Sequence, residues 1–261
     1  MLVFSALTPH PPLLIPAIGK EKGEYLNKTR ESIRRLEEDL YVTHPQVMIV
    51  ILSHQIKLKK SFLININPQY ETDFEKFGDL ATKRQWDGAP YLGAKIAQCE
   101  TDDLPIRLIS NQKIDYGASV PLFFLTEHLP NIQVLVIGCP EFESKNHLHF
   151  GEILKENIML SNKRIAIIAS GDLSHTLHSD SPTGFKPEGE QFDRQIINLL
   201  ETRNTLGIAQ MDKTLVDNAE QCIHQPLLVL LGIMKNMNYT FKNYSYESPF
   251  GVGYLTGNFV F

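Results

Sequence analysis

The stretch VMIVIL at residues 47–52 contains six consecutive apolar residues, four of which are β-branched. An unbroken apolar run of this length is typical of a strand that is buried on both faces of a sheet. Similar runs recur along the chain and alternate with segments of helical period, a pattern that predicts an α/β protein built on a central sheet. The expected strands are 2–7, 47–52, 61–67, 105–110, 132–138, 164–170 and 254–261.

Helical periodicity is clearest at residues 20–40, where apolar residues recur on one side and Glu, Lys and Arg lie opposite. We expect Asp87 to act as the N-cap of a second helix. Further helices are expected at 87–99, 118–129, 186–202 and 225–237.

A long irregular segment lies between the run at 164–170 and the helix expected near Glu190. Its sequence, GDLSHTLHSDSPTGFKPEGE, is rich in Gly, Pro, Ser and Asp. Loops of this length inside a compact domain are usually functional, and we interpret this one as a lid over a site. No Gly/Ser-rich linker divides the chain, so residues 1–261 are expected to form a single domain.

Composition limits the class of protein. The chain has 261 residues and a formal charge of −5, which argues against a nucleic-acid surface. No apolar run approaches the ~18 residues that a membrane span needs, so no membrane partner is expected. Three cysteines, odd in number and widely spaced, do not form a disulfide framework and suit a reducing compartment. These features predict a cytoplasmic protein.

Three of the nine histidines share one placement in the sequence. His10, His54 and His175 each follow a run that is expected to be a buried strand. Active sites of open α/β sheets assemble at the carboxyl ends of the strands, so these three side chains could converge. A single histidine after a strand is usually a loop residue bonded to a carbonyl group, and the shared placement is what favours a site here.

A metal held by two histidines needs a third ligand. The best candidate segment is DNAEQCIHQPLLVLL at 217–231, in which Glu220, Cys222 and His224 precede an apolar helix. Glu220 on a solvent-facing segment would be only a surface charge. Beside a buried helix start, with few other charges nearby, it could turn inward.

Several motifs, in order, cover nearly the whole chain and together resemble one family. The chain resembles the class III extradiol ring-cleavage dioxygenases, the superfamily of the protocatechuate 4,5-dioxygenase beta subunit, and within it the bacterial branch of Memo-like, AmmeMemoRadiSam-type proteins. The motifs are LTPHPPLLIP, VILSHQ, ASGDLSHTL with TGFKPEGEQFD, AEQC with QPLLVLLG, and YESPFGVGYL.

This resemblance implies a fold, a cofactor and a reaction. The fold would be a mixed central β-sheet with helices on both faces, often in homo-oligomers. The cofactor would be non-haem Fe(II), held by His10, His54 and Glu220. His175 would be the acid/base residue in the oxidative opening of an aromatic diol ring, with a small aromatic compound and O2 as substrates. A 2-His-1-carboxylate set leaves open positions on iron, which suits this chemistry.

The sequence also departs from the family pattern. The usual SPHG is Ser53-His54-Gln55 here, and Tyr116 stands where many relatives have a substrate-side histidine. Tyr116 can donate a hydrogen bond but carries no charge at neutral pH. Asp172 and His178, from the segment after the strand at 164–170, are further candidates for the substrate pocket.

Cys222 introduces a second ligand option. The resemblance implies that in the Memo-like proteins a cysteine in the matching segment takes the third metal position, and a thiolate would favour copper or zinc over iron. Two alternatives to the dioxygenase therefore stay open: a Memo-like metal-binding redox or interaction protein without ring cleavage, and a zinc hydrolase that uses the same ligands.

Overall fold

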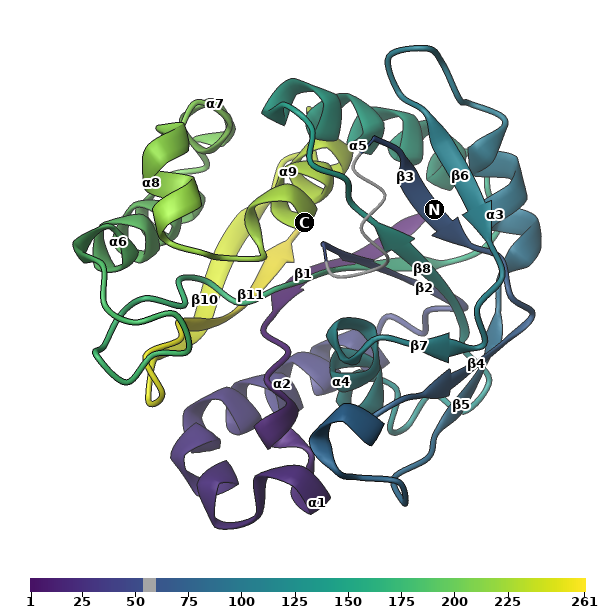
Figure 1. Ribbon diagram of the computed structural model, residues 1–261. Coiled ribbons are helices and arrows are strands. Elements are labelled where there is room, and N and C mark those ends of the chain that lie inside the picture. Colours follow the sequence, from purple (N-terminus) through teal and green to yellow (C-terminus); the bar gives the residue numbers. More distant parts are fainter. Residues whose placement is uncertain (54–59) are drawn as a thin grey trace.

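Four parallel strands form the centre of the sheet in the computed structural model, which describes residues 1–53 and 60–261 (Figure 1). Strands β1, β9, β2 and β8 lie side by side in that order. Every residue of β2 and β9 is buried, as their unbroken apolar sequences predict. Their bounds are Leu2–Thr8 for β1, Ile165–Ser170 for β9, Val47–Leu52 for β2 and Gln133–Gly138 for β8.

Antiparallel pairs extend this parallel centre on both sides, so the sheet is mixed, as predicted. Strand β11 runs antiparallel to β1, and β10 pairs with β11. On the other side, the start of β8 pairs with β5 and its end pairs with β3. The outer strands are β3 (Phe62–Asn65), β4 (Gln69–Thr72), β5 (Gln85–Gly88), β6 (Ile106–Ile109), β7 (Lys113–Ile114), β10 (Thr240–Glu247) and β11 (Tyr254–Val260).

Helices cover both faces of the sheet, as expected (Figure 1). Because side chains alternate along a strand, neighbouring residues of β2 enter two different hydrophobic clusters. Ile49 belongs to a cluster with residues of helices α5 (Ser144–Met159) and α9 (His224–Ile233). Val50 belongs to a cluster with residues of helices α2 (Asn27–Tyr41) and α4 (Tyr116–Leu125).

The expected helices are present, with one wrong cap, and four of the helices that the structure describes were not predicted. Asp87 does not cap a helix: it lies in β5 and is paired with Gln133 of β8. The helix that follows begins at Pro90, whose fixed backbone angle suits a first helical position. Helix α5 and the three shortest helices, which have four to six residues, are absent from the predicted set. The remaining helices are α1 (Pro16–Gly19), α3 (Pro90–Ala97), α6 (Pro187–Glu201), α7 (Thr205–Ala209) and α8 (Lys213–Asn218), with 3-10 turns at Pro12–Leu14, Lys20–Leu26 and Glu75–Phe77.

The irregular segment predicted after β9 is a loop, and residues 171–186 contain neither helix nor strand. Backbone hydrogen bonds hold its first half against the rest of the protein. Leu173 N–H donates to the Gly253 carbonyl at 2.8 Å, and His175 N–H donates to the Ala219 carbonyl at 2.9 Å. This part of the loop is therefore held in place by hydrogen bonds, and the role of the loop as a lid stays a prediction.

The single tryptophan of the chain, Trp86, is buried on β5. Its indole N–H donates to Thr126 Oγ1 at 2.8 Å, directly after the end of α4. Thr126 Oγ1 in turn donates to the Leu122 carbonyl of that helix at 2.7 Å. The indole is thus attached to the C-terminal end of α4.

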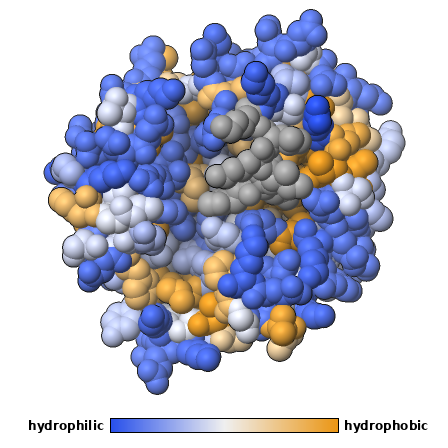
Figure 2. Space-filling view, in the orientation of Figure 1, coloured by the Kyte–Doolittle hydropathy of each residue, from blue (hydrophilic) through white to orange (hydrophobic). Residues whose placement is uncertain are grey.

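The surface seen in Figure 2 is mainly hydrophilic, with apolar side chains in small scattered groups. This agrees with the ordinary share of charged residues in the chain, 21%. Among the residues that the structure places, no helix combines the length and the apolar character that crossing a membrane requires.

Candidate metal centre

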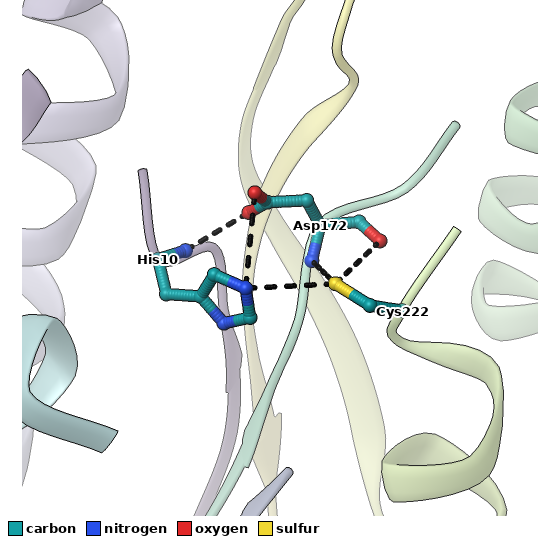
Figure 3. Close-up of side chains that lie close together, drawn as sticks. All are labelled: His10, Asp172 and Cys222. Carbon is teal, nitrogen blue, oxygen red and sulfur yellow. Dashed lines mark hydrogen bonds and ion pairs between the residues drawn. The ribbon is translucent and has the colours of Figure 1, made fainter. Parts of the chain in front are cut away.

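Three potential metal ligands meet at the carboxyl edge of the parallel strands (Figure 3). One ligand atom each from His10, Asp172 and Cys222 lies within 4.8 Å of the other two, and all three residues are buried. Within residues 1–53 and 60–261 they are the one such group of His, Cys, Asp or Glu side chains. They come from the segment after β1, the loop after β9 and the segment before α9.

His10 is held by its backbone as well as by its ring. Its backbone N–H donates to Asp172 Oδ1 at 2.9 Å, and the residue is 1% exposed. Pro9 and Pro11 on either side restrict the chain, as their sequence predicts. The ring nitrogen Nε2 lies 3.5 Å from Cys222 Sγ and 3.9 Å from Asp172 Oδ2. Nε2 is therefore the nitrogen that faces the other two ligands.

Asp172 and Cys222 are joined by two hydrogen bonds, one to the Cys222 sulfur and one between their backbones. Asp172 N–H donates to Cys222 Sγ at 3.1 Å, and Cys222 N–H donates to the Asp172 carbonyl at 3.2 Å. Gly171 permits this approach, because a Cβ atom there would lie 2.6 Å from the Cα atom of Ile223. The glycine of the GDLSH motif thus lets two distant segments of the chain touch.

A buried carboxyl group on α6 is hydrogen-bonded to the loop after β9. Asp193 of α6 is 1% exposed; its Oδ1 accepts from Ser174 N–H at 2.8 Å and its Oδ2 accepts from Tyr246 O–H at 2.7 Å. Gly189 packs in the same region, because a Cβ atom there would lie 2.5 Å from Ser174 Oγ. The PEGEQFD and GDLSH motifs are therefore parts of one packed unit.

Burial sets the charge of two of the three potential ligands. Desolvation lowers the pKa of His10 to about 3, opposed by the negative charge of Asp115, with the charge of His175 lowering it further. The imidazole is therefore neutral at pH 7. Desolvation and the charge of Asp172 raise the pKa of the Cys222 thiol well above its ordinary value. The thiol must lose a proton to bind a metal, so binding would release one.

Aromatic side chains line the cluster. Tyr116 lies edge-on to the His10 ring with the ring centroids 5.3 Å apart, and it also contacts Phe77. Burial, followed by the charge of Asp115, raises the pKa of Tyr116, so its phenol stays neutral. Tyr254 at the start of β11 is buried, and its pKa is raised by burial and then by the charge of Asp172. Both phenols can donate hydrogen bonds.

The other predicted site residues lie in different places. His54 is outside the described residues. His175 is half-buried in the loop after β9, close enough for its charge to affect His10. His178 is exposed on the same loop, where its backbone N–H donates to Ser181 Oγ at 2.8 Å.

Glu220 lies apart from the cluster. Its side chain is 37% exposed, and its Oε1 lies 2.5 Å from Lys186 Nζ. Its backbone has a φ of 50°, in the left-handed region. Glu220 as a ligand stays a prediction from the resemblance, and the carboxyl group that the structure brings to His10 belongs to Asp172.

Sequence reasoning missed three polar residues at this site. Ser170 is the last residue of β9, and its Oγ lies 2.9 Å from His10 Nδ1. Asp115 is the N-cap of α4, where its Oδ1 accepts from Gly117 N–H at 2.8 Å. The third is Tyr254. The available signal was position, because Ser170 and Asp115 directly precede a loop and a helix that carry predicted site residues.

Comparison with known proteins defines the class. The family described as "Catalytic LigB subunit of aromatic ring-opening dioxygenase" matches residues 5–257. The chain therefore belongs to the LigB family, as its motifs predict.

Two individual proteins are similar to this chain. Protein CA_C1420 of Clostridium acetobutylicum is 27% identical over 258 residues, which are 95% of this chain and 55% of that protein. The chain thus spans about half the length of the curated relative that it matches. The crystal structure of the uncharacterized protein JW3007 from Escherichia coli K12 has a TM-score of 0.66 at 15% identity, covering 98% of this chain and 99% of that one. This second likeness concerns the fold.

Proposed function

We propose that the chain is a metal-dependent dioxygenase that opens the ring of an aromatic diol. The observation that supports this most strongly is the buried cluster of His10, Asp172 and Cys222 in a member of the LigB family. Imidazole nitrogen, carboxylate oxygen and thiolate sulfur are all common metal-binding groups, so the donor set fits a transition metal. His54, outside the described residues, would be a fourth ligand.

The residues around the cluster have distinct tasks in this proposal. Fe(II) bound there would supply Lewis acidity and open positions at which the diol and O2 could meet. The His175 imidazole would accept a proton from a substrate hydroxyl and later return one. The neutral phenol of Tyr116 would donate a hydrogen bond to the substrate.

Activity under controlled metal loading tests the proposal. The protein would be loaded with Fe(II) without oxygen and then given catechol, protocatechuate or an aminophenol with O2. We expect a coloured ring-opened product with matching O2 uptake, lost in His175→Ala. His149→Ala removes an exposed histidine of α5 and is the control. No turnover on any of these substrates by the iron-loaded protein would count against ring cleavage.

Cys222 favours a second candidate function, a metal-binding redox or interaction protein of the Memo-like type. Its sulfur lies 3.5 Å from His10 Nε2, and thiolates prefer copper or zinc. Metal analysis of the purified protein separates the two candidates. Copper or zinc retained by the wild type and lost in Cys222→Ser, without turnover, would support the second; iron retention with ring cleavage would support the first.

A further inference from the structure

The second ring nitrogen of His10 takes part in a buried chain of hydrogen bonds. His10 Nδ1 lies 2.9 Å from Ser170 Oγ, and Ser170 Oγ donates to the Gly117 carbonyl at 2.5 Å. The Ser170 side chain is fully buried. A hydroxyl group has one proton and a carbonyl oxygen can only accept. The Ser170 proton therefore lies toward Gly117, and the hydroxyl accepts from Nδ1–H of His10.

The Gly117 carbonyl is available because of a proline one turn further along α4. In an α-helix this carbonyl would accept from the N–H of residue 121. Residue 121 is Pro121, inside the helix, and proline has no N–H to give. The proline ring also crowds the carbonyl four residues before it. Pro121 thus leaves the Gly117 oxygen for a donor from outside the helix, and that donor is Ser170.

Helix α4 also contacts the His10 ring directly. A Cβ atom on Gly117 would lie 3.5 Å from His10 Cε1 and 2.9 Å from a methyl carbon of Leu52. The first turn of α4 therefore packs against both the imidazole and the end of β2. This packing keeps the carbonyl at the position where Ser170 reaches it.

We infer that Pro121, Gly117 and Ser170 act together as positioning residues that hold His10 as its Nδ1–H tautomer. In this tautomer the lone pair is on Nε2, the nitrogen that faces Cys222 and Asp172. A fixed tautomer and ring orientation raise the metal affinity of a histidine, and loss of such a partner typically costs about 10- to 100-fold. The inference rests on the proposed metal site, but the tautomer itself is a property of the metal-free protein.

Nuclear magnetic resonance of the metal-free protein tests the tautomer. Long-range proton–nitrogen correlations of 15N-histidine-labelled protein distinguish a protonated Nδ1 from a protonated Nε2, and loss of a signal in His10→Gln assigns His10. We expect Nδ1–H in the wild type. In Ser170→Ala we expect a mixture or the Nε2–H form, with affinity for Zn²⁺ about 10- to 100-fold weaker.

Matched variants separate this role from general packing. Ser5 of β1 is also fully buried, and its hydroxyl has no hydrogen-bond partner within the described residues. We expect Ser5→Ala to change neither the tautomer nor the Zn²⁺ affinity, and Ser170→Thr, which keeps a hydroxyl, to restore both. Pro121→Ala supplies an N–H that competes for the Gly117 carbonyl, so its effect should be intermediate.

The outcomes distinguish this inference from the proposed function. A wild-type His10 in the Nε2–H form, or an unchanged Nδ1–H form in Ser170→Ala, would overturn the inference even if metal binds. A different result is also informative: His10 is in the Nδ1–H form in the wild type and changes in Ser170→Ala, but the wild type binds no Zn²⁺, Fe²⁺ or Cu²⁺. This result would support the role of Ser170 in holding the tautomer and reject the metal site. If Pro121→Ala keeps the Nδ1–H tautomer of the wild type, then Pro121 has no part in holding that tautomer.

Discussion

The segment from Ala219 to Ile223 has two sides that lie in different environments. On the inner side, Cys222 is 6% exposed, its Sγ accepts from Asp172 N–H, and its own N–H donates to the Asp172 carbonyl. On the outer side, Glu220 is 37% exposed and is paired with Lys186. Only one residue separates the two in sequence, yet one belongs to the buried cluster with His10 and Asp172 and the other to a surface ion pair. Proximity in sequence therefore says little about which of two candidate ligands enters a site.

Metal retention gives the largest expected difference between the two sides. Cys222→Ser removes one of three clustered donors, and we expect metal affinity to fall at least about 100-fold. Glu220→Gln should leave affinity unchanged, because its partner is Lys186. Competition with a chelator measures both variants against the wild type. The reverse result, with loss in Glu220→Gln alone, would restore Glu220 as the ligand.

The contact that keeps Cys222 on the inner side can be broken at Gly171. In Gly171→Ala the new methyl group would lie 2.6 Å from the Cα atom of Ile223, a backbone atom that cannot rotate away. We expect the free energy of unfolding to fall by about 3 kcal/mol, together with weaker metal binding. Urea denaturation measures the first effect. A fully stable variant with normal metal affinity would show that the two segments can separate without cost.

The buried carboxyl group of Asp193, which is hydrogen-bonded to the loop that carries Asp172, makes the stability of the protein depend on pH. Burial raises the pKa of Asp193 to about 7 from its ordinary value of 3.8, so the folded protein binds this proton more tightly than the unfolded chain. Its contribution to stability therefore falls as pH rises from about 4 to about 7. Between about pH 5.5 and 7.5 the loss is about 2 kcal/mol.

Asp193→Asn removes this dependence while keeping an acceptor for Ser174 N–H. We expect the variant to gain stability relative to the wild type as the pH rises, measured by urea denaturation at the two pH values. Comparison within each pH cancels the effect of His10, His147 and His224, whose pKa values are lowered mainly by burial and act in the opposite direction. A difference between the two proteins that does not vary with pH would mean that Asp193 titrates normally.

The centre of the fold follows from local sequence, and its margins do not. The run at 47–52 is apolar throughout because β2 is buried on both faces, so pattern and structure agree. Strands β4, β5 and β7 are two to four residues long and contain Glu, Asp, Lys or Gly. They are strands because of the neighbours with which they pair, which no local pattern records. Helix α5 was missed because its buried side includes His147 and Gly151.

The candidate site also contains some residues whose placement local sequence predicts and others whose placement depends on distant contacts. His10 and Asp172 follow buried strands, so their placement at one edge could be predicted from strand order. The placement of Cys222, rather than Glu220, beside His10 depends on the close contact between residues 171 and 223, which are far apart in the sequence. The Ser170 hydroxyl donates to the Gly117 carbonyl of a separate helix, in which residue 121, four positions further on, is a proline without an N–H. Such dependence on a distant partner cannot be read from either segment alone.

The attachment of the only tryptophan to α4 has a practical consequence for spectroscopy. The indole of Trp86 is bound at one end of the helix, and the Gly117 carbonyl lies in the first turn at the other end. Its fluorescence is therefore an intrinsic optical reporter of α4 that needs no label. A change in emission on adding metal would indicate that the whole helix responds, whereas a silent indole would confine the response to its first turn.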